Sequence, residues 1–152
     1  MKLRGILNPA LLEAIGQVGH GDVVVLADAG LRIPPGKPAI HLELTCGIPT
    51  MAQVVAAFLT EMVVEAAIVA TEFREWNPDV HDAVVGLLPV TPTTAPHVDL
   101  MADMAERARL YVKTGECSAY SSVALVAGVN YLDAAIELRD RVAAEREAGT
   151  RP

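Results

Sequence analysis

The sequence predicts an α/β fold, a three-layer α/β/α sandwich around a largely parallel or mixed central sheet. Three short apolar runs, at 23–27, 63–70 and 123–127, have the pattern of strands that are covered on both faces. Segments of helical periodicity alternate with these runs, as expected when helices cover the faces of a sheet. With 152 residues and no repeat or linker, the chain is expected to form a single domain over 1–152.

The first helix is expected to start at Asn8 and Pro9, because Asn caps free backbone N–H groups and Pro is tolerated in the first turn. The glycines that follow should end it. After the first apolar run, residues 32–38 hold three prolines and predict a loop. Residues 40–44 alternate between apolar and polar side chains, which is typical of a strand with one less buried face.

The middle of the chain begins with a second capping signal. Thr50 and Gln53 have the spacing of a capping box, which predicts a helix from this point. The run at 63–70 is then expected to be a strand, although its alanines also favour a helix. A second Asn-Pro pair precedes a helix expected over 79–88, and three prolines predict that 89–96 is extended or looped.

The last third of the chain predicts two helices around one strand. A helix is expected over 98–112, with Gly115 placed to terminate it. The run at 123–127 is the third buried strand. A charged amphipathic helix over 133–148 follows, so residues 131–152 are expected to form a C-terminal helical extension.

The composition argues against several classes of partner. Twelve Lys and Arg against 19 Asp and Glu give a net charge of -7, which disfavours nucleic acid and anionic membranes. No apolar run approaches the roughly 20 residues that span a bilayer, and the N-terminus lacks the apolar stretch of a signal peptide, so a cytoplasmic protein is expected.

Hydrophobic residues make up 52% of the chain, which suggests that another subunit covers some surface. Cys46 and Cys117 are too few and too far apart for a disulfide framework or a CxxC zinc site.

Two residues beside the first buried strand are the first candidates for a site. His20 lies between two glycines, which leave the imidazole and the backbone open to a ligand, with an exposed loop histidine as the alternative. Asp28 directly follows the strand, where α/β sheets place ligands. It could contact a sugar or a cation, or cap the following turn.

A polar loop at 116–122 is the third candidate region. Its hydroxyl groups suit the binding of a polyol, and Tyr120 adds a flat apolar face for a sugar ring. Cys117 in this loop is expected to be a buried, inert cysteine rather than a nucleophile. His97 opens the predicted helix at 98–112 and is a candidate ligand contact, with a surface histidine as the alternative.

The absence of familiar motifs narrows the classes of reaction that this chain is expected to catalyse. The sequence has no dinucleotide fingerprint, P-loop, HxH or HExxH metal motif, or GxSxG elbow. The remaining histidines, aspartate and hydroxyls indicate a site without metal or cofactor. Such a site can do general acid-base chemistry or bind a polar molecule.

Eight short motifs, in order along the chain to about Val129, together resemble the RbsD/FucU family of D-ribose pyranases and L-fucose mutarotases. The motifs are GILN at 5–8, GHGD at 19–22, DAGL at 28–31 with Ile33-Pro34, GIP at 47–49, VEAAIVA at 64–70 with Glu72, Asn77-Pro78, GECS at 115–118 with Tyr120, and AGV at 127–129. DAGL, GIP and GECS are closer to the ribose branch than to the fucose branch.

The resemblance implies an RbsD-like fold and a cofactor-free intramolecular isomerase. The reaction would interconvert pyranose and furanose forms of a monosaccharide, with β-D-ribopyranose to β-D-ribofuranose as the leading expectation. His20 matches the family's catalytic proton donor. The matching substrate-binding positions are Asp28, His97 and Tyr120. The family further implies a ring-shaped homo-oligomer, expected to be a decamer.

The chain departs from the pyranase pattern directly after Tyr120. Ser121 and Ser122 stand where the pyranases have Ala-Asn, and the loss of the amide removes two donors and an acceptor. Both serines are therefore candidate substrate contacts that bear on the identity of the sugar. A mutarotase for another sugar, such as L-fucose, is an alternative.

The spacing of His20 and Asp28 makes a geometric prediction. They lie at opposite ends of one strand, and eight residues at about 3.3 Å each separate them by up to roughly 26 Å, too far to hold one five-carbon sugar. We therefore expect His20 of one protomer to meet the Asp28 region of its neighbour. The competing hypotheses are a sugar-binding or transport-associated protein without turnover and a purely structural oligomer.

Overall fold

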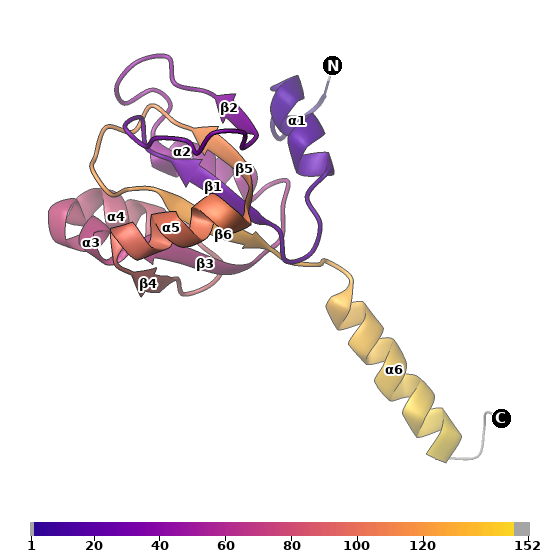
Figure 1. Cartoon of the computed structure of the whole chain (residues 1–152). Helices are drawn as coiled ribbons and strands as arrows, with labels where there is room; N and C mark the ends of the chain where they lie inside the picture. Colours follow the sequence, from indigo (N-terminus) through magenta and orange to yellow (C-terminus); the bar gives the residue numbers. More distant parts are fainter. Residues whose placement is uncertain (1, 148–152) are drawn as a thin grey trace.

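The computed structural model, which describes residues 2–147, folds around one six-stranded sheet with the order β2-β5-β1-β6-β3-β4 (Figure 1). Strand β6 runs antiparallel to its neighbours β1 and β3, whereas the β1-β5, β2-β5 and β3-β4 pairs are parallel. The sheet is therefore mixed, and the predicted α/β class is confirmed. The strands are β1 Val23–Ala27, β2 Ala39–His41, β3 Val64–Ala70, β4 Thr93–Ala95, β5 Ala108–Lys113 and β6 Val123–Ala127.

Helices cover the sheet on both faces. Figure 1 shows α5 in front of the sheet and α2 behind it, and both helices contact β1. Every side chain of β1 is consequently at most 1% exposed, as predicted for a strand covered on both faces. The helices are α1 Pro9–Gly16, α2 Met51–Phe58, α3 Thr71–Trp76, α4 Pro78–Val85, α5 His97–Arg107 and α6 Leu132–Glu147.

Both capping signals in the first half of the chain act as predicted. The Asn8 side chain accepts a hydrogen bond of 3.1 Å from the Leu11 N–H and caps α1. Thr50 and Gln53 form the reciprocal capping box of α2, with bonds of 3.2 and 3.0 Å between side chains and backbone N–H groups. These caps fix where the two helices begin.

The predicted helix over 98–112 is wrong in its last third. Helix α5 ends at Arg107, and residues 108–113 form β5, which pairs with β1 on one side and β2 on the other. Pairing on both edges satisfies the backbone of β5, and Tyr111 and Val112 favour the extended conformation in which they are buried. Gly115 therefore does not end a helix. A β-carbon there would overlap backbone carbonyls of the turn at 45–48, so the glycine permits a close approach of two chain segments.

The remaining differences are at the edges of the sheet. The strand expected over 40–44 is shorter and earlier, because only Ala39–His41 pairs with β5. The stretch 89–96 contains the short edge strand β4, which pairs with β3. Helix α3 was not predicted. It has only six residues and lies in the connection between β3 and α4.

Helix α6 extends away from the rest of the chain (Figure 1). It covers Leu132–Glu147, close to the prediction of 133–148, whose last residue lies outside the described part. Its exposed apolar side chains include Ile136 and Leu138. Within residues 2–147, no helix is both long and apolar enough to cross a membrane.

Candidate functional site

His20 lies in a tight loop that is held against the end of β6. The Gly19 N–H donates to the Asp22 carboxylate at 2.8 Å, and Arg109 lies 3.2 Å from the same oxygen. The Gly21 N–H donates to the Ala127 carbonyl at 2.8 Å, and Gly21 has a positive φ of 81°. The loop backbone is therefore fixed, while the His20 side chain is 56% exposed.

The imidazole of His20 has one carboxylate partner, Glu65 on β3. Their Nε2 and Oε2 atoms lie 2.8 Å apart. The residues are 45 positions apart in the sequence, and the sheet brings them together. Sequence reasoning did not assign a role to Glu65, because nothing local links it to His20.

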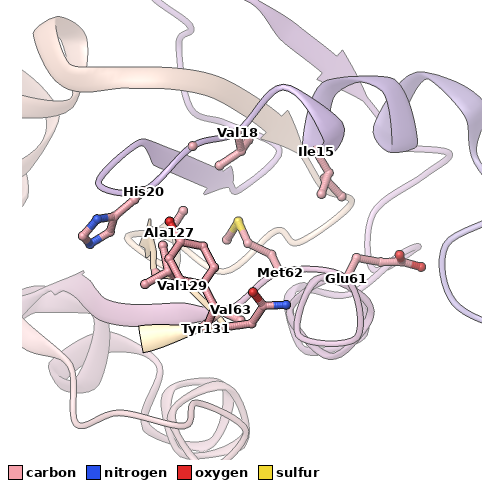
Figure 2. Close-up of a pocket in the computed structure, with 12 residues that line it drawn as sticks. Ile15, Val18, His20, Glu61, Met62, Val63, Ala127, Val129 and Tyr131 are labelled. Atoms are coloured by element: carbon pink, nitrogen blue, oxygen red, sulfur yellow. The ribbon is translucent and has the colours of Figure 1, made fainter. Parts of the chain in front are cut away.

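His20 also lines a cavity of about 370 Å³, which we call the His20 pocket (Figure 2). In this view, His20 and Glu61 lie on opposite sides, with Met62 and Val18 between them. A hydrogen bond from Lys2 and another from the Ile6 N–H lower the pKa of the Glu61 carboxyl below its ordinary value. The lining residues are Ile15, Val18, Gly19, His20, Glu61, Met62, Val63, Ala127, Gly128, Val129, Asn130 and Tyr131.

Asp28 lies at the other end of β1 and is 8% exposed. Its Oδ1 accepts from the Gly30 N–H at 3.0 Å, which closes the turn after the strand. Its Oδ2 accepts from the Ser122 hydroxyl at 2.7 Å, and that hydroxyl in turn accepts from the Asp28 N–H at 3.1 Å. The carboxylate is thus held in one orientation at the carboxyl end of a buried strand.

Asp28 belongs to the second cavity, of about 830 Å³, which we call the Asp28 pocket. His97 and Tyr120 both line it, with ring centroids 5.0 Å apart in an edge-to-face arrangement. The backbone N–H of His97 donates to both oxygens of Glu72, at 2.9 and 3.1 Å, while its buried Nδ1 has no hydrogen-bond partner among the described residues. A buried polar atom without a partner is unusual in a folded protein, and it belongs here to a residue that lines the pocket. The pocket is lined by Asp28, Ala29, Gly30, Leu31, Arg32, His97, Met101, Cys117, Ser118, Ala119 and Tyr120.

Among residues 2–147, Tyr120 is the only residue other than glycine that has a positive φ, at 62°. This left-handed conformation is uncommon for a bulky residue and is held here by ring contacts with Trp76 and His97. The ring contributes a flat apolar surface to the Asp28 pocket.

The polar loop at 116–122 is used more for its own structure than the sequence predicted. The Ser121 hydroxyl donates to the Ser118 carbonyl at 2.8 Å, and Ser122 is engaged with Asp28, so neither serine lines the pocket. Both are at most 1% exposed. Glu116, also buried, accepts from the N–H and the hydroxyl of Ser118 and from the N–H of Met51.

The expectation of a buried, inert Cys117 is wrong, and the distance between Cys46 and Cys117 in the sequence does not prevent them from pairing. Cys117 is exposed and forms a disulfide with Cys46, with Cα atoms 5.7 Å apart. The pairing follows from the fold, because the Gly47 N–H donates to the Gly115 carbonyl at 2.6 Å and draws the two loops together. A separation of 71 residues in the sequence hid this contact.

The chain does not bring all of the predicted site residues together. Asp28, His97 and Tyr120 share one pocket, whereas His20 lines another that has no lining residue in common with it. The five residues of β1 separate the two, about 17 Å at ~3.3 Å per residue. No group of three or more His, Cys, Asp or Glu side chains within residues 2–147 is arranged to hold a metal ion.

Comparison with known proteins gives one family. The model of the RbsD / FucU transport protein family matches residues 1–130. A D-ribose pyranase from Paracidovorax citrulli is 45% identical over 131 residues, which cover 86% of this chain and 100% of that protein. A D-ribose pyranase from Chloroflexus aggregans is 43% identical over 129 residues, covering 85% and 98% of the two chains.

Solved structures agree with this result. Bacillus subtilis RbsD complexed with D-ribose matches with a TM-score of 0.80 and 33% identity, covering 85% of this chain and 98% of that chain. The fucose mutarotase from Streptococcus pneumoniae, in complex with L-fucose, matches with a TM-score of 0.62 and 22% identity, covering 81% and 94% of the two chains. At this lower identity the likeness shows the fold alone.

Proposed function

The chain belongs to the RbsD/FucU family, and we propose that it is a cofactor-free monosaccharide isomerase that interconverts β-D-ribopyranose and β-D-ribofuranose. The observation that carries the proposal is that the likeness to D-ribose pyranases extends over the full length of those relatives. It therefore includes His20 as well as the Asp28 pocket. Asp28, His97 and Tyr120 supply the directional polar atoms and the flat ring surface that a sugar requires.

The reaction opens one hemiacetal ring and closes another, and each step is assisted by proton transfers. In ring opening, the bond between C1 and the ring oxygen breaks as that oxygen gains a proton and the anomeric hydroxyl loses one, which leaves a free aldehyde. In ring closure, the C4 hydroxyl attacks C1 and the protons move in the reverse sense. An imidazole can donate and accept a proton near neutral pH, so His20 can serve both steps. Asp28, His97 and Tyr120 hold the sugar.

The separation of the two pockets supports a site built from two protomers. His20 and Asp28 lie at opposite ends of β1, and one chain alone cannot apply both to the same five-carbon sugar. In the proposal, His20 of one protomer reaches the Asp28 pocket of its neighbour. The finer parts of the proposal, a ring-shaped homodecamer and a cytoplasmic location, rest on the family resemblance.

The activity is tested by saturation-transfer NMR on D-ribose. Wild-type protein should accelerate pyranose–furanose exchange, and His20→Ala should lose roughly 10²–10⁴-fold of that rate, the usual contribution of positioned proton transfer. His41→Ala is the matched control, because His41 is 60% exposed and lies 2.7 Å from the Glu43 carboxylate. If wild-type protein binds ribose without accelerating exchange, it is a sugar-binding protein and the proposal fails.

The shared site is tested by mixing two inactive variants, His20→Ala and Asp28→Ala. In a random 1:1 assembly, about a quarter of the sites should combine an intact His20 from one protomer with an intact Asp28 from its neighbour. Native mass spectrometry verifies that the subunits have exchanged. Mixed oligomers without recovered activity, or an active monomer in sedimentation, would contradict the two-protomer site.

A further inference from the structure

We propose that Glu65 is the positioning residue for His20: its carboxylate holds Nε2 of the imidazole, so that Nδ1 is the nitrogen that exchanges a proton with the sugar. The inference rests on the proposed function, because it requires His20 to act on the substrate. The relevant contact is the 2.8 Å approach of the His20 Nε2 to the Glu65 Oε2.

Glu65 lies at an irregular point of β3. The pairing of β3 with β6 shifts register between Val64 and Ala66, so Glu65 is the extra residue of a β-bulge. Glu65 and Ala66 are both exposed in succession, which breaks the alternation of a regular strand. Bulges redirect a side chain and occur often beside functional sites. Here the bulge places the carboxylate beside the His20 loop.

Gly128 leaves space beside the Glu65 side chain. A β-carbon at position 128 would lie 3.0 Å from the Glu65 Cβ and 3.3 Å from the Oε2 that contacts His20. Contacts this short would require the Glu65 side chain to give by a few tenths of an ångström. Glycine at the end of β6 therefore leaves room for the carboxylate in the position where it meets the imidazole.

One end of β6 supports both the His20 loop and the Glu65 segment. Ala127 accepts from the Gly21 N–H at 2.8 Å and donates its own N–H to the Asp22 carbonyl at 2.9 Å, so the His20 loop is fixed to β6. The bulge at Glu65 is paired to the same end of β6. The two backbone segments that carry the imidazole and the carboxylate are thus held to the same strand end, which favours the positioning of a catalytic group.

The chemistry follows from the two nitrogens of the ring. A carboxylate accepts hydrogen bonds, so it selects the form in which Nε2 carries a hydrogen and leaves Nδ1 to accept or donate the transferred proton. The same carboxylate stabilises the imidazolium that forms when Nδ1 takes up a proton, as in other carboxylate–histidine pairs. Within residues 2–147, the Glu65 carboxylate has no hydrogen-bond partner besides His20, so a purely structural use is not evident.

The test compares Glu65→Ala and Glu65→Asp with the control Glu43→Ala, which removes the carboxylate that lies 2.7 Å from His41. Glu65→Ala should lower kcat for ribose exchange by about ten- to a hundredfold, the range seen when the hydrogen-bond partner of a metal-bound imidazole is removed, with KM changed less than about twofold. Glu65→Asp should recover part of kcat. Gly128→Ala should lower kcat with both side chains still present.

A second readout does not depend on activity. Nitrogen-15 NMR of the histidine rings should show His20 with hydrogen on Nε2 in wild type and a changed tautomer population in Glu65→Ala, but not in Glu43→Ala. If His20→Ala is inactive while Glu65→Ala keeps the wild-type kcat and tautomer, the role of Glu65 is wrong. If His20→Ala retains wild-type exchange, His20 is not the proton donor and the positioning role of Glu65 is wrong, whereas the isomerase activity itself still stands.

Discussion

The hydroxyl of Ser122 is expected to be among the most important single polar groups for the stability of this fold. It donates to the Asp28 Oδ2 at 2.7 Å and accepts from the Asp28 N–H at 3.1 Å. Ser122 is 1% exposed and Asp28 is 8% exposed, so water cannot readily replace it. Ser122→Ala would leave a buried N–H and one carboxylate oxygen without their partner.

The expected cost follows from the two lost bonds. An unsatisfied buried N–H costs about 1–3 kcal/mol, and a hydrogen bond to a charged group contributes about 1.5–3 kcal/mol. Their combined loss should lower the free energy of unfolding by about 3 kcal/mol. At about 2–4 °C per kcal/mol for a domain of this size, Tm should fall by roughly 6–12 °C. Because the Asp28 carboxylate also loses its fixed orientation, KM for ribose should rise.

Ser121→Ala is the matched control. Its hydroxyl is equally buried but makes one bond, of 2.8 Å, to a neutral carbonyl. That loss should cost about 1 kcal/mol, or roughly 2–4 °C in Tm. Thermal and urea unfolding of both variants at the same protein concentration measure the difference. If Ser122→Ala is no less stable than Ser121→Ala, the reasoning from the Asp28 contacts is wrong.

Three further predictions concern other parts of the fold. Because Lys2 lowers the pKa of Glu61, the stabilisation from this pair is present above the ordinary value of 4.5 and is lost as pH falls through the lowered value, so the Tm difference between wild type and Lys2→Met should shrink as pH is lowered below 4.5. Burial raises the pKa of Tyr111 above 10.0, so stability should fall as pH rises past that value while the unfolded chain ionises, and Tyr111→Phe should flatten this alkaline loss in urea unfolding. Gly115→Ala should lower Tm by more than about 5 °C, since its β-carbon would overlap backbone carbonyls at 45–48, and a wild-type Tm would contradict this.

The elements that the sequence predicted well are those with a local cause. The caps at Asn8 and Thr50 involve residues three positions away, and the buried strand at 23–27 is apolar throughout. Strand β5 lacks such a local sign, because it follows α5 without a turn and owes its conformation to β1 and β2 on either side. Pairing between distant segments decided its structure over local helix propensity.

The same distinction applies to the site. Asp28, His97 and Tyr120 were candidates from their sequence context, and the fold places all three in one pocket. Their partners were not recognisable, because Ser122 is 94 residues from Asp28 and Glu72 is 25 residues from His97. The one available sign for Glu65 was a charge inside an otherwise apolar strand.

The antiparallel strand β6 explains why the two pockets form at opposite ends of β1. Its register places its first residues beside the end of β1 and its last residues beside the start. Ser122, directly before β6, therefore meets Asp28, while Ala127 at its other end holds the His20 loop. One pair of strands thus organises both halves of the proposed site at opposite edges of the protomer. A sugar can contact both halves only where two such edges meet, so in the proposed enzyme the oligomer is a condition of activity and dissociation should abolish exchange before the subunits unfold.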